Sequence, residues 1–486
     1  MLTKNKKEDL INYLEDTSNI KGNADLLYLP KNKDEVSFAL REAVDKRIPL
    51  TFSSGRTGTT GGCVPYEGAV ISSDNLNRVI DIDPKQGIAH LEAGVSLEAL
   101  ENEAGKFGLT LKASPTESLA YIGGAISTAA SGVRGFGYGG IRDYVTEIKV
   151  FLTTGDIINI QRGSIFSHLR RFDFQHQGKN FKFNLPTYNL PLVKSQAGYF
   201  IRDNMDLIDL FIGSEGTLGF IGACKVLLQK KPFNIFDGLL FFQKEREALD
   251  FAAKIKELKK KGFLKPTSLE FFDKNSLKLL GDKYSFIPES ESAVYFEQDV
   301  KDETENDLLL DRWQDLMEKS NALMDKSIFA DTPALRKKIF EFRHSLPQMI
   351  NEFLRQNRQV KVATDISVLD SKFDQMYRFY KEIAEESGVN YVNFGHIGES
   401  HLHFNFLPQD SKEFIKAKEC LGIFCKKAVS LGGTVSAEHG IGKIKRPYLK
   451  IMYNQKHIRE MAQLKKYFDP YCLLGLDNIF DKELLF

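Results

Sequence analysis

The first half of the chain alternates short apolar or β-branched runs with Gly-rich turns, a pattern that predicts strands. These runs lie at residues 48–54, 68–73, 87–95 and 146–160. Helical periodicity fits between some of them, because Asp34 and Ser96 can each cap a helix, the second ending by Gly108. The pattern therefore predicts a mixed α+β region.

The pattern changes after Pro232 to strand, helix, strand, helix and strand. The runs 238–243, 267–273 and 292–298 look like strands, and Ala248, Phe251, Ala252 and Ile255 share one helical face. This order predicts an antiparallel sheet with helices on one side. The expected domains are residues 1–230 with a surface insertion at about 160–195, residues 231–460, and a tail, 461–486, that returns to the first domain.

Bulk composition narrows the function classes. The 486 residues carry 66 Lys and Arg against 65 Asp and Glu, so no global charge favours nucleic acid, and the basic aromatic segment 160–200 is interpreted as an insertion. The five cysteines form no CxxC pair, and no apolar run approaches the length of a membrane span. The polar N-terminus does not resemble a targeting signal. We expect a cytoplasmic protein, with peripheral attachment to the inner membrane face as an alternative.

Three Gly-rich segments can bring backbone close to a ligand. Residues 53–65, "SSGRTGTTGGCVP", can aim backbone N–H groups at an anion, but they lack the Lys of an ATP-binding P-loop; a plain hairpin loop is the alternative. Residues 135–140 satisfy GxGxxG without the strand and helix of a dinucleotide site. Together, the loop 53–65, the small residues of 123–133 and the loop 211–221 suggest an extended ligand that carries phosphates.

These segments, with "KSQAGY" at 194–199, resemble the FAD-contacting segments of the para-cresol-methylhydroxylase-type FAD-binding domain. The resemblance covers residues 30–230 and implies non-covalent FAD, since no His or Cys stands where that family attaches flavin. It also implies that Arg56 supplies phosphate charge from a shifted position. The implied FAD-binding residues are Ser54, Gly55, Arg56, Thr57, Gly58, Pro115, Thr116, Gly123, Gly124, Ser127, Thr128, Ser131, Glu215, Thr217 and Gly219.

Histidines concentrate in "YVNFGHIGESHLHFNFLP", residues 391–408. His396, His401 and His403 lie within eight residues, and alternation places His401, His403 and Asn405 on one strand face. A lone His is usually structural, but three of nine histidines together with a distant Glu-His pair favour a metal site. Imidazoles and a carboxylate with open positions would form a Lewis-acid centre.

"GHIGESHLH" and "GGTVSAEHGIGK" resemble motifs of the FAD-linked D-2-hydroxyacid dehydrogenases, whose second domain is a ferredoxin-like antiparallel-sheet cap. The resemblance implies oxidation of a lactate-, glycolate- or 2-hydroxyglutarate-class acid to the 2-oxo acid, with hydride transfer to flavin N5. It implies a divalent metal, zinc before manganese or iron, on His396, His403 and Glu438. The implied catalytic residues are His439 as base, Asn405 on the substrate, and Arg343 or Lys361 on its carboxylate.

Two departures from the family pattern separate this chain from its relatives. Glu399, Ser400 and His401 replace Asp-Gly-Asn, so His401 either joins the metal or stands in for Asn. The tail reads GLDN where NPGK is usual, which puts its docking in question. The alternatives are a non-catalytic FAD-binding subunit and a non-redox enzyme like alkyl-glycerone-phosphate synthase. The electron acceptor, a quinone or an electron-transfer protein, stays open, as does a homodimer or a larger complex.

Overall fold

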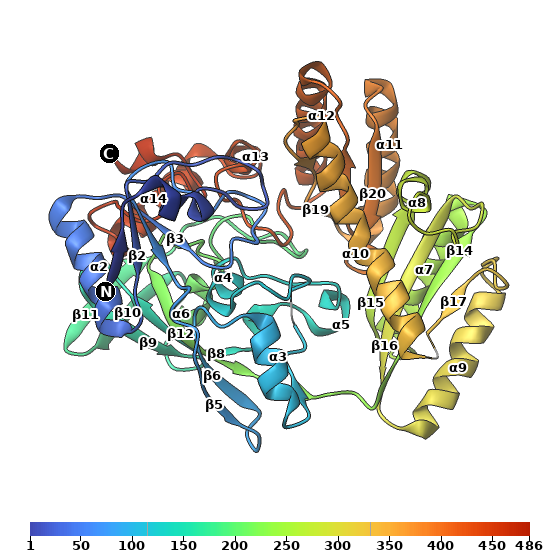
Figure 1. Ribbon diagram of the computed structural model, residues 1–486, viewed down its shortest axis with the longest axis horizontal. Helices are drawn as coiled ribbons and strands as arrows, with labels where there is room; N and C mark the ends of the chain where they lie inside the picture. The colour runs from blue at the N-terminus through green and yellow to red at the C-terminus, as the bar shows by residue number, and fades with distance from the viewer. Residues whose placement is uncertain (114, 331) are drawn as a thin grey trace. The chain divides into compact units, whose positions relative to one another are not determined.

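The computed structural model describes residues 1–113, 115–330 and 332–486, which form two compact units (Figure 1). The first unit contains Met1–Gly132, Gly140–Lys230 and Thr434–Phe486, and the second contains Val133–Gly139 and Lys231–Gly433. Residues 434–460, predicted in the second domain, thus pack with the first unit. The reason is a pair of hydrogen bonds that the backbone N–H groups of Ile441 and Gly442 donate to the Glu215 carboxylate.

A four-stranded sheet begins the first unit, in the order β1-β2-β4-β3. Its strands are β1 (Leu2–Lys4), β2 (Leu26–Leu29), β4 (Ala69–Ser72) and β3 (Leu50–Ser53). Helix α2 (Lys33–Lys46) buries Val36 and Leu40 against this sheet. The predicted cap at Asp34 is wrong: Asn32 caps the helix, because its side chain accepts from the N–H groups of Asp34 and Glu35. The predicted Ser96 cap of α3 (Leu97–Gly105) is confirmed.

A five-stranded sheet in the order β5-β6-β12-β8-β9 forms the rest of this core. Its strands are β5 (Val79–Asp83), β6 (Ile88–Glu92), β12 (Phe220–Leu227), β8 (Val145–Phe151) and β9 (Ile157–Gln161). The strand predicted at 146–160 is therefore two strands, because Gly155 turns the chain between them with a φ of +86°. The loop 211–221 runs directly into the central strand β12.

The insertion expected at 160–195 contains a hairpin, β10 (Arg171–His176) with β11 (Lys179–Asn184). Phe172 is fully buried, and the Phe183 ring lies 4.9 Å from that of Phe468 on helix α14 (Gln455–Phe468). The alternating aromatic residues thus anchor the hairpin to the C-terminal helix. One face of the hairpin therefore packs within the first unit, while most side chains of its other face are exposed.

The C-terminal tail packs within the first unit. Leu50 of β3 donates its N–H to Leu473 O and accepts from the Gly475 N–H. The Asn478 amide donates to Gly62 O at 2.8 Å and to Glu215 O at 3.1 Å, and its oxygen accepts from Lys443. The altered sequence GLDN therefore keeps a tight junction with two of the Gly-rich segments.

An eight-stranded antiparallel sheet organises the second unit, in the order β17-β14-β16-β15-β20-β21-β18, with β19 paired to β21. Its strands are β14 (Asn234–Phe242), β15 (Pro266–Asp273), β16 (Ser292–Val300), β17 (Ile328–Phe329), β18 (Val362–Ala363), β19 (Ile366–Ser367), β20 (Tyr391–Gly395) and β21 (His401–Phe406). Its long helices are α7 (Glu245–Lys260), α9 (Glu303–Glu318), α10 (Pro333–Gln356), α11 (Phe373–Ser387) and α12 (Ser411–Ser430).

Helices cover both faces of this sheet, so the expectation of helices on one side is wrong. Leu240 and Phe242 pack in the cluster with α7 and α9, whereas Leu239 and Phe241 pack in the cluster with α10. The reason is already in the composition of β14, whose consecutive apolar residues leave no polar face for solvent. Among the described residues, no helix combines the length and the apolar character that a membrane crossing requires.

Candidate functional site

The loop after β3 offers backbone N–H groups to an anion. Within the described chain, none of the N–H groups from Gly55 to Thr60 donates to another residue. The Arg56 side chain, by contrast, is engaged: it donates to Ser54 O at 2.9 Å and pairs with Asp74 at 3.2 Å. The loop therefore fits a phosphate through its backbone, while the Arg56 charge is already balanced by Asp74.

The second Gly-rich segment forms the short helix α4 (Ile122–Ser127), which lies close to its neighbours where Gly123 and Gly124 lack side chains. A Cβ on Gly124 would come within 2.8 Å of Ser54 Oγ, a buried atom with no hydrogen-bond partner among the described residues. Ser127 and Thr128 donate their hydroxyls to carbonyls of α4 itself. The Ser54 hydroxyl thus lacks a partner next to a glycine where backbone is open to close approach. Both features fit a flat cofactor that lies against the backbone.

Glu215 of the third segment, 211–221, bonds to the backbone of another loop of the same unit. Its Oε1 accepts from Ile441 N at 2.7 Å and its Oε2 from Gly442 N at 2.6 Å. Burial raises the pKa of this carboxyl to about 7, although the two N–H donors favour the charged form. Glu215 thus clamps the loop that carries Glu438 and His439 to the segment 211–221. Within the same segment, Thr217 bonds to the Tyr199 hydroxyl, and Gly219 lies against Val150.

Glu438 is buried in the first unit, and polar side chains of that unit surround its carboxylate. Lys194 Nζ and Ser131 Oγ lie 2.9 Å and 3.1 Å from its Oε2. His439 Nε2 is 3.6 Å from Glu438 Oε1, and a third of the His439 side chain is exposed. The sequence reasoning did not give Lys194 a role, although it stands in the "KSQAGY" segment. Pro115 is half-buried and Thr116 is exposed.

Three histidines meet in the second unit, where β20 turns back into β21. The ring centroids of His396, His401 and His403 lie 5.3, 5.2 and 4.6 Å apart, and each ring offers a nitrogen within 4.8 Å of the others. The pairing of Phe394 with His403 fixes the register between β20 and β21, and so brings His396 and His403 together. Imidazole nitrogens grouped in this way fit a divalent cation such as zinc.

Buried acids orient two of these rings. Glu270 accepts from His396 Nδ1 at 2.5 Å and from Arg343 at 3.1 Å, and Asp365 Oδ1 lies 2.9 Å from His401 Nε2. Burial acts to raise the Glu270 pKa, but the charges of His396 and Arg343 outweigh it and lower the value to about 2. Because Nδ1 of His396 faces an ionised acid, its Nε2 is left for a metal. Glu270 and Asp365 were not predicted from the sequence.

The substrate residues expected from the sequence lie in the same unit. Arg343 is 6% exposed, and its Nε has no hydrogen-bond partner among the described residues. Asn405 is buried and donates to His403 O at 2.9 Å, while its Oδ1 has no partner in the described part of the chain. Lys361 is half-buried beside β18. Two buried polar atoms without partners next to an imidazole cluster are typical of a ligand site.

Comparison with known proteins gives matches over most of the chain. Residues 24–161 match the FAD binding domain model, and residues 237–475 match the model of the C-terminal domain of FAD linked oxidases. The chain is 28% identical to glycolate oxidase subunit GlcD of Bacillus subtilis, over 94% of this chain and 89% of that protein. It is 29% identical to D-lactate dehydrogenase of Archaeoglobus fulgidus, over 93% and 90% respectively.

Solved structures with little sequence identity share the fold. A p-cresol methylhydroxylase structure with substrate bound superposes with a TM-score of 0.72 at 12% identity, covering 99% of this chain and 94% of that one. An alkyldihydroxyacetonephosphate synthase structure gives 0.67 at 16%, covering 97% and 82%. The predicted α+β fold, an FAD-binding domain followed by an antiparallel-sheet domain, is confirmed.

Proposed function

The chain belongs to the FAD-linked oxidase family, and from this we propose that it oxidises a D-2-hydroxy acid to the 2-oxo acid. One observation carries the proposal: Glu215 of the FAD segment clamps the loop that bears Glu438 and His439. A carboxylate and an imidazole are thereby fixed to the segment that would hold the flavin. The names of the relatives, a glycolate oxidase subunit and a D-lactate dehydrogenase, support the same class of substrate.

His439 takes the proton of the substrate hydroxyl. A third of the His439 side chain is exposed, and its Nε2 lies 3.6 Å from Glu438 Oε1, so the ring is accessible and stands beside the carboxylate. Lys194 Nζ in turn lies 2.9 Å from Glu438 Oε2 and fixes that carboxylate. The flavin, when bound, supplies the hydride acceptor.

The family resemblance implies that His396, His403 and Glu438 would hold a divalent ion, zinc before manganese or iron. Such an ion, when bound, lowers the pKa of the substrate hydroxyl. Glu270 bonds to Nδ1 of His396, which leaves Nε2 of that ring for the ion. Arg343 binds the substrate carboxylate through Nε, the guanidinium nitrogen that has no partner among the described residues, since Glu270 accepts from Nη2. Asn405 Oδ1 accepts a hydrogen bond from the substrate. Lys361 is the alternative cation for the carboxylate.

Anaerobic reduction of the flavin tests the function. A panel of D- and L-2-hydroxy acids is added to the purified yellow protein, and bleaching of the flavin absorbance is recorded by stopped flow. We expect a D-acid to bleach it, and His439→Ala to slow bleaching by about 10²–10⁴-fold, the usual contribution of a general base. His168→Ala, which alters an exposed histidine of the same unit, is the control and should match the wild type.

A flavin that dithionite reduces but that no acid of the panel bleaches would show the proposal to be wrong. That result would favour a non-catalytic FAD-binding subunit. If His439→Ala bleaches at the wild-type rate, the proposed substrate class is retained and the role of His439 as the base is refuted.

A further inference from the structure

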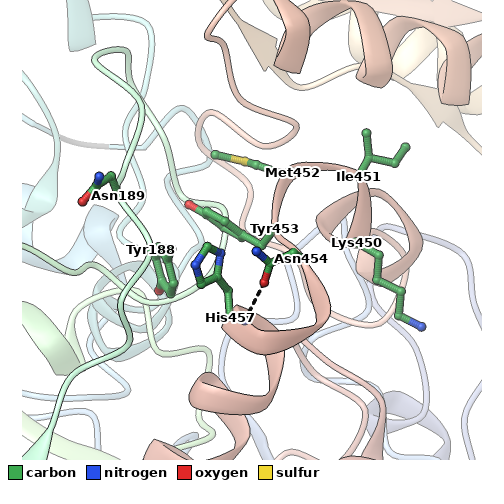
Figure 2. Close-up of a pocket in the computed structure, with 8 residues that line it drawn as sticks. All are labelled: Tyr188, Asn189, Lys450, Ile451, Met452, Tyr453, Asn454 and His457. Carbon is green, nitrogen blue, oxygen red and sulfur yellow. Dashed lines mark hydrogen bonds between the residues drawn. The ribbon is translucent and has the colours of Figure 1, made fainter.

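The open pocket of the first unit at the junction of helices α13 (Arg446–Met452) and α14 has no role in the proposed oxidation (Figure 2). Its lining residues Tyr188 and Tyr453 are buried, so their rings offer a ligand little surface. Lys450 pairs with Asp481, so its charge is already balanced. These features select no particular ligand.

The "GFGYGG" segment, by contrast, makes specific contacts in the second unit. Val133–Gly139 belong to that unit, although the residues on both sides of them belong to the first. The loop begins directly after the small residues of 123–132, and the Ile141 N–H closes its base by donating to Ala130 O at 3.0 Å. A segment that would hold the flavin is therefore continuous with a loop that packs in the second unit.

Two side chains anchor this loop to strand β16. Arg134 Nε donates to the Glu297 carboxylate at 2.6 Å, and the Tyr138 hydroxyl donates to Asp299. Glu297 and Asp299 are two residues apart on the strand, so they lie on the same face of the sheet. With an anchor near each end, the residues between Arg134 and Tyr138 are held in place.

The short helix α5 (Gly135–Tyr138) lies between these anchors, directly on strand β15. A Cβ on Gly137 would come within 2.5 Å of Thr267 Cα, so a residue with a side chain could not approach the strand so closely. Lys259 donates its ammonium group to Phe136 O, and its Nζ also lies 3.6 Å from the centroid of the Phe136 ring. The loop thus presents the Phe136 ring in a fixed position.

The Phe136 ring supports the turn that follows His396. This turn is the 3₁₀ helix Ile397–Glu399, and Ile397 belongs to the hydrophobic cluster against which Phe136 packs. A Cβ on Gly398 would have three atoms of the Phe136 ring as its nearest neighbours, with Cγ at 2.6 Å. Gly398 is not among the residues with positive φ, so its lack of a side chain serves this contact and not a strained backbone.

The position of the turn determines where His396 lies. The His396 carbonyl accepts from the N–H groups of Glu399 and His401 at 3.0 and 3.2 Å, so His396 and the turn form one hydrogen-bonded unit. Glu270 orients the His396 ring, but it does not fix the height of the turn above the sheet. That support comes from Phe136.

From these contacts we propose that Phe136 is a positioning residue, which holds the turn at Gly398 so that His396 can bind the divalent ion with the other histidines. The assignment rests on the ion of the proposed function but does not depend on its substrate. It also gives the GxGxxG segment a role other than dinucleotide binding, because its glycines let α5 approach β15 and Glu399.

Zinc affinity of the FAD-loaded chain tests the proposal without any hydroxy acid. Zinc is titrated by calorimetry into the wild type, Phe136→Ala, Gly398→Ala and the double variant, and His403→Ala identifies the heat that belongs to the histidine cluster. We expect each single variant to weaken zinc binding about tenfold, as loss of a group that supports a metal ligand usually does. Because both changes act through one contact, the double variant should bind zinc as Phe136→Ala does, and not about 100-fold more weakly than the wild type.

Two variants of the same unit are matched controls. Gly422→Ala on α12 places a Cβ in open space, and Phe263→Ala removes an exposed ring. Both should bind zinc like the wild type. Fluorescence of Trp313, which is buried in this unit, shows in parallel how much stability each variant loses.

A loss of stability without a loss of zinc affinity would show that Phe136 only packs, and would overturn the proposal. Losses that multiply in the double variant would do the same, as would a wild type that binds no zinc at the histidines. A chain that shows the expected zinc affinities but whose flavin no 2-hydroxy acid bleaches would retain the role of Phe136 and refute the dehydrogenase.

Discussion

Replacement of Glu270 by Gln offers a quantitative test of the second unit. The Glu270 side chain is 1% exposed and serves two donors, Arg343 at 3.1 Å and His396 Nδ1 at 2.5 Å. Glutamine has the same shape but only one accepting atom, so it can serve one donor and must turn its NH₂ toward the other. Glu270→Gln also leaves the Arg343 guanidinium buried without a counter-charge.

The expected loss follows from these contacts. Removal of one partner of a buried ion pair costs about 3–5 kcal/mol, and the hydrogen bond that Gln keeps returns about 1 kcal/mol. We therefore expect Glu270→Gln to lower the free energy of unfolding by about 3 kcal/mol. Adding Arg343→Met removes the stranded charge, so the double variant should lie within about 1–2 kcal/mol of the wild type.

The single tryptophan makes this measurable in the right part of the chain. Trp313 is fully buried in the second unit, with its ring 3.9 Å from that of Phe296, so its fluorescence in guanidinium chloride follows unfolding of that unit. Glu352→Gln on the exposed side of α10, whose carboxylate bonds to Arg355 and Gln356, is the control and should unfold at the same denaturant midpoint as the wild type. A Glu270→Gln variant as stable as wild type, or a double variant weaker than the single one, would refute the reasoning.

Three further results are expected. Burial raises the Asp273 pKa to about 6, so the native state binds the extra proton and the free energy of unfolding falls as pH rises from about 4 to 6. Asp273→Asn should make this slope shallower, with Asp237, whose pKa burial also raises to about 6, keeping its own share, and should gain up to about 3 kcal/mol at pH 7.5 by the same fluorescence assay. Glu215→Gln leaves one of two backbone N–H groups without an acceptor, so substrate bleaching of the flavin should slow at least tenfold while Trp313 unfolding is unchanged. His403→Ala should weaken zinc binding by about 100-fold or more in calorimetry, whereas His168→Ala should not change it.

Local patterns in the sequence predicted the parts of the site that lie along one strand or loop. Alternation placed His403 and Asn405 on the same face of one strand, and in the structure both lie on β21 and pair with β20, opposite Phe394 and Val392. The Gly-rich segments and the family resemblance predicted an FAD-binding domain, which the family models confirm. Strand alternation depends only on a few neighbouring residues, so it can be predicted without knowledge of the fold.

Periodicity failed where a residue's partner is distant in the chain. The phenylalanines of 172–183 alternate, but nothing local indicates helix α14, on which Phe183 packs, so this contact was not predicted. Asp34 was chosen as a cap by residue type, and the observed hydrogen bonds show that Asn32, two residues earlier, caps the helix instead. The two-sided sheet was missed because one apolar run fits either a buried strand or one face of a helix.

Glu270 carried a usable signal that the motif search passed over. It stands in "TSLEFFD", where the strand is buried along its whole length, and an acid in such a strand must be paired. The pairing could only be an Arg or His presented by another element, and the same unit supplies both, Arg343 from α10 and His396 from the end of β20. The residue that fixes an imidazole of the histidine cluster is therefore found by asking which buried charge lacks a local partner. The same question leads to Glu215, whose partners are backbone N–H groups more than 200 residues away in sequence.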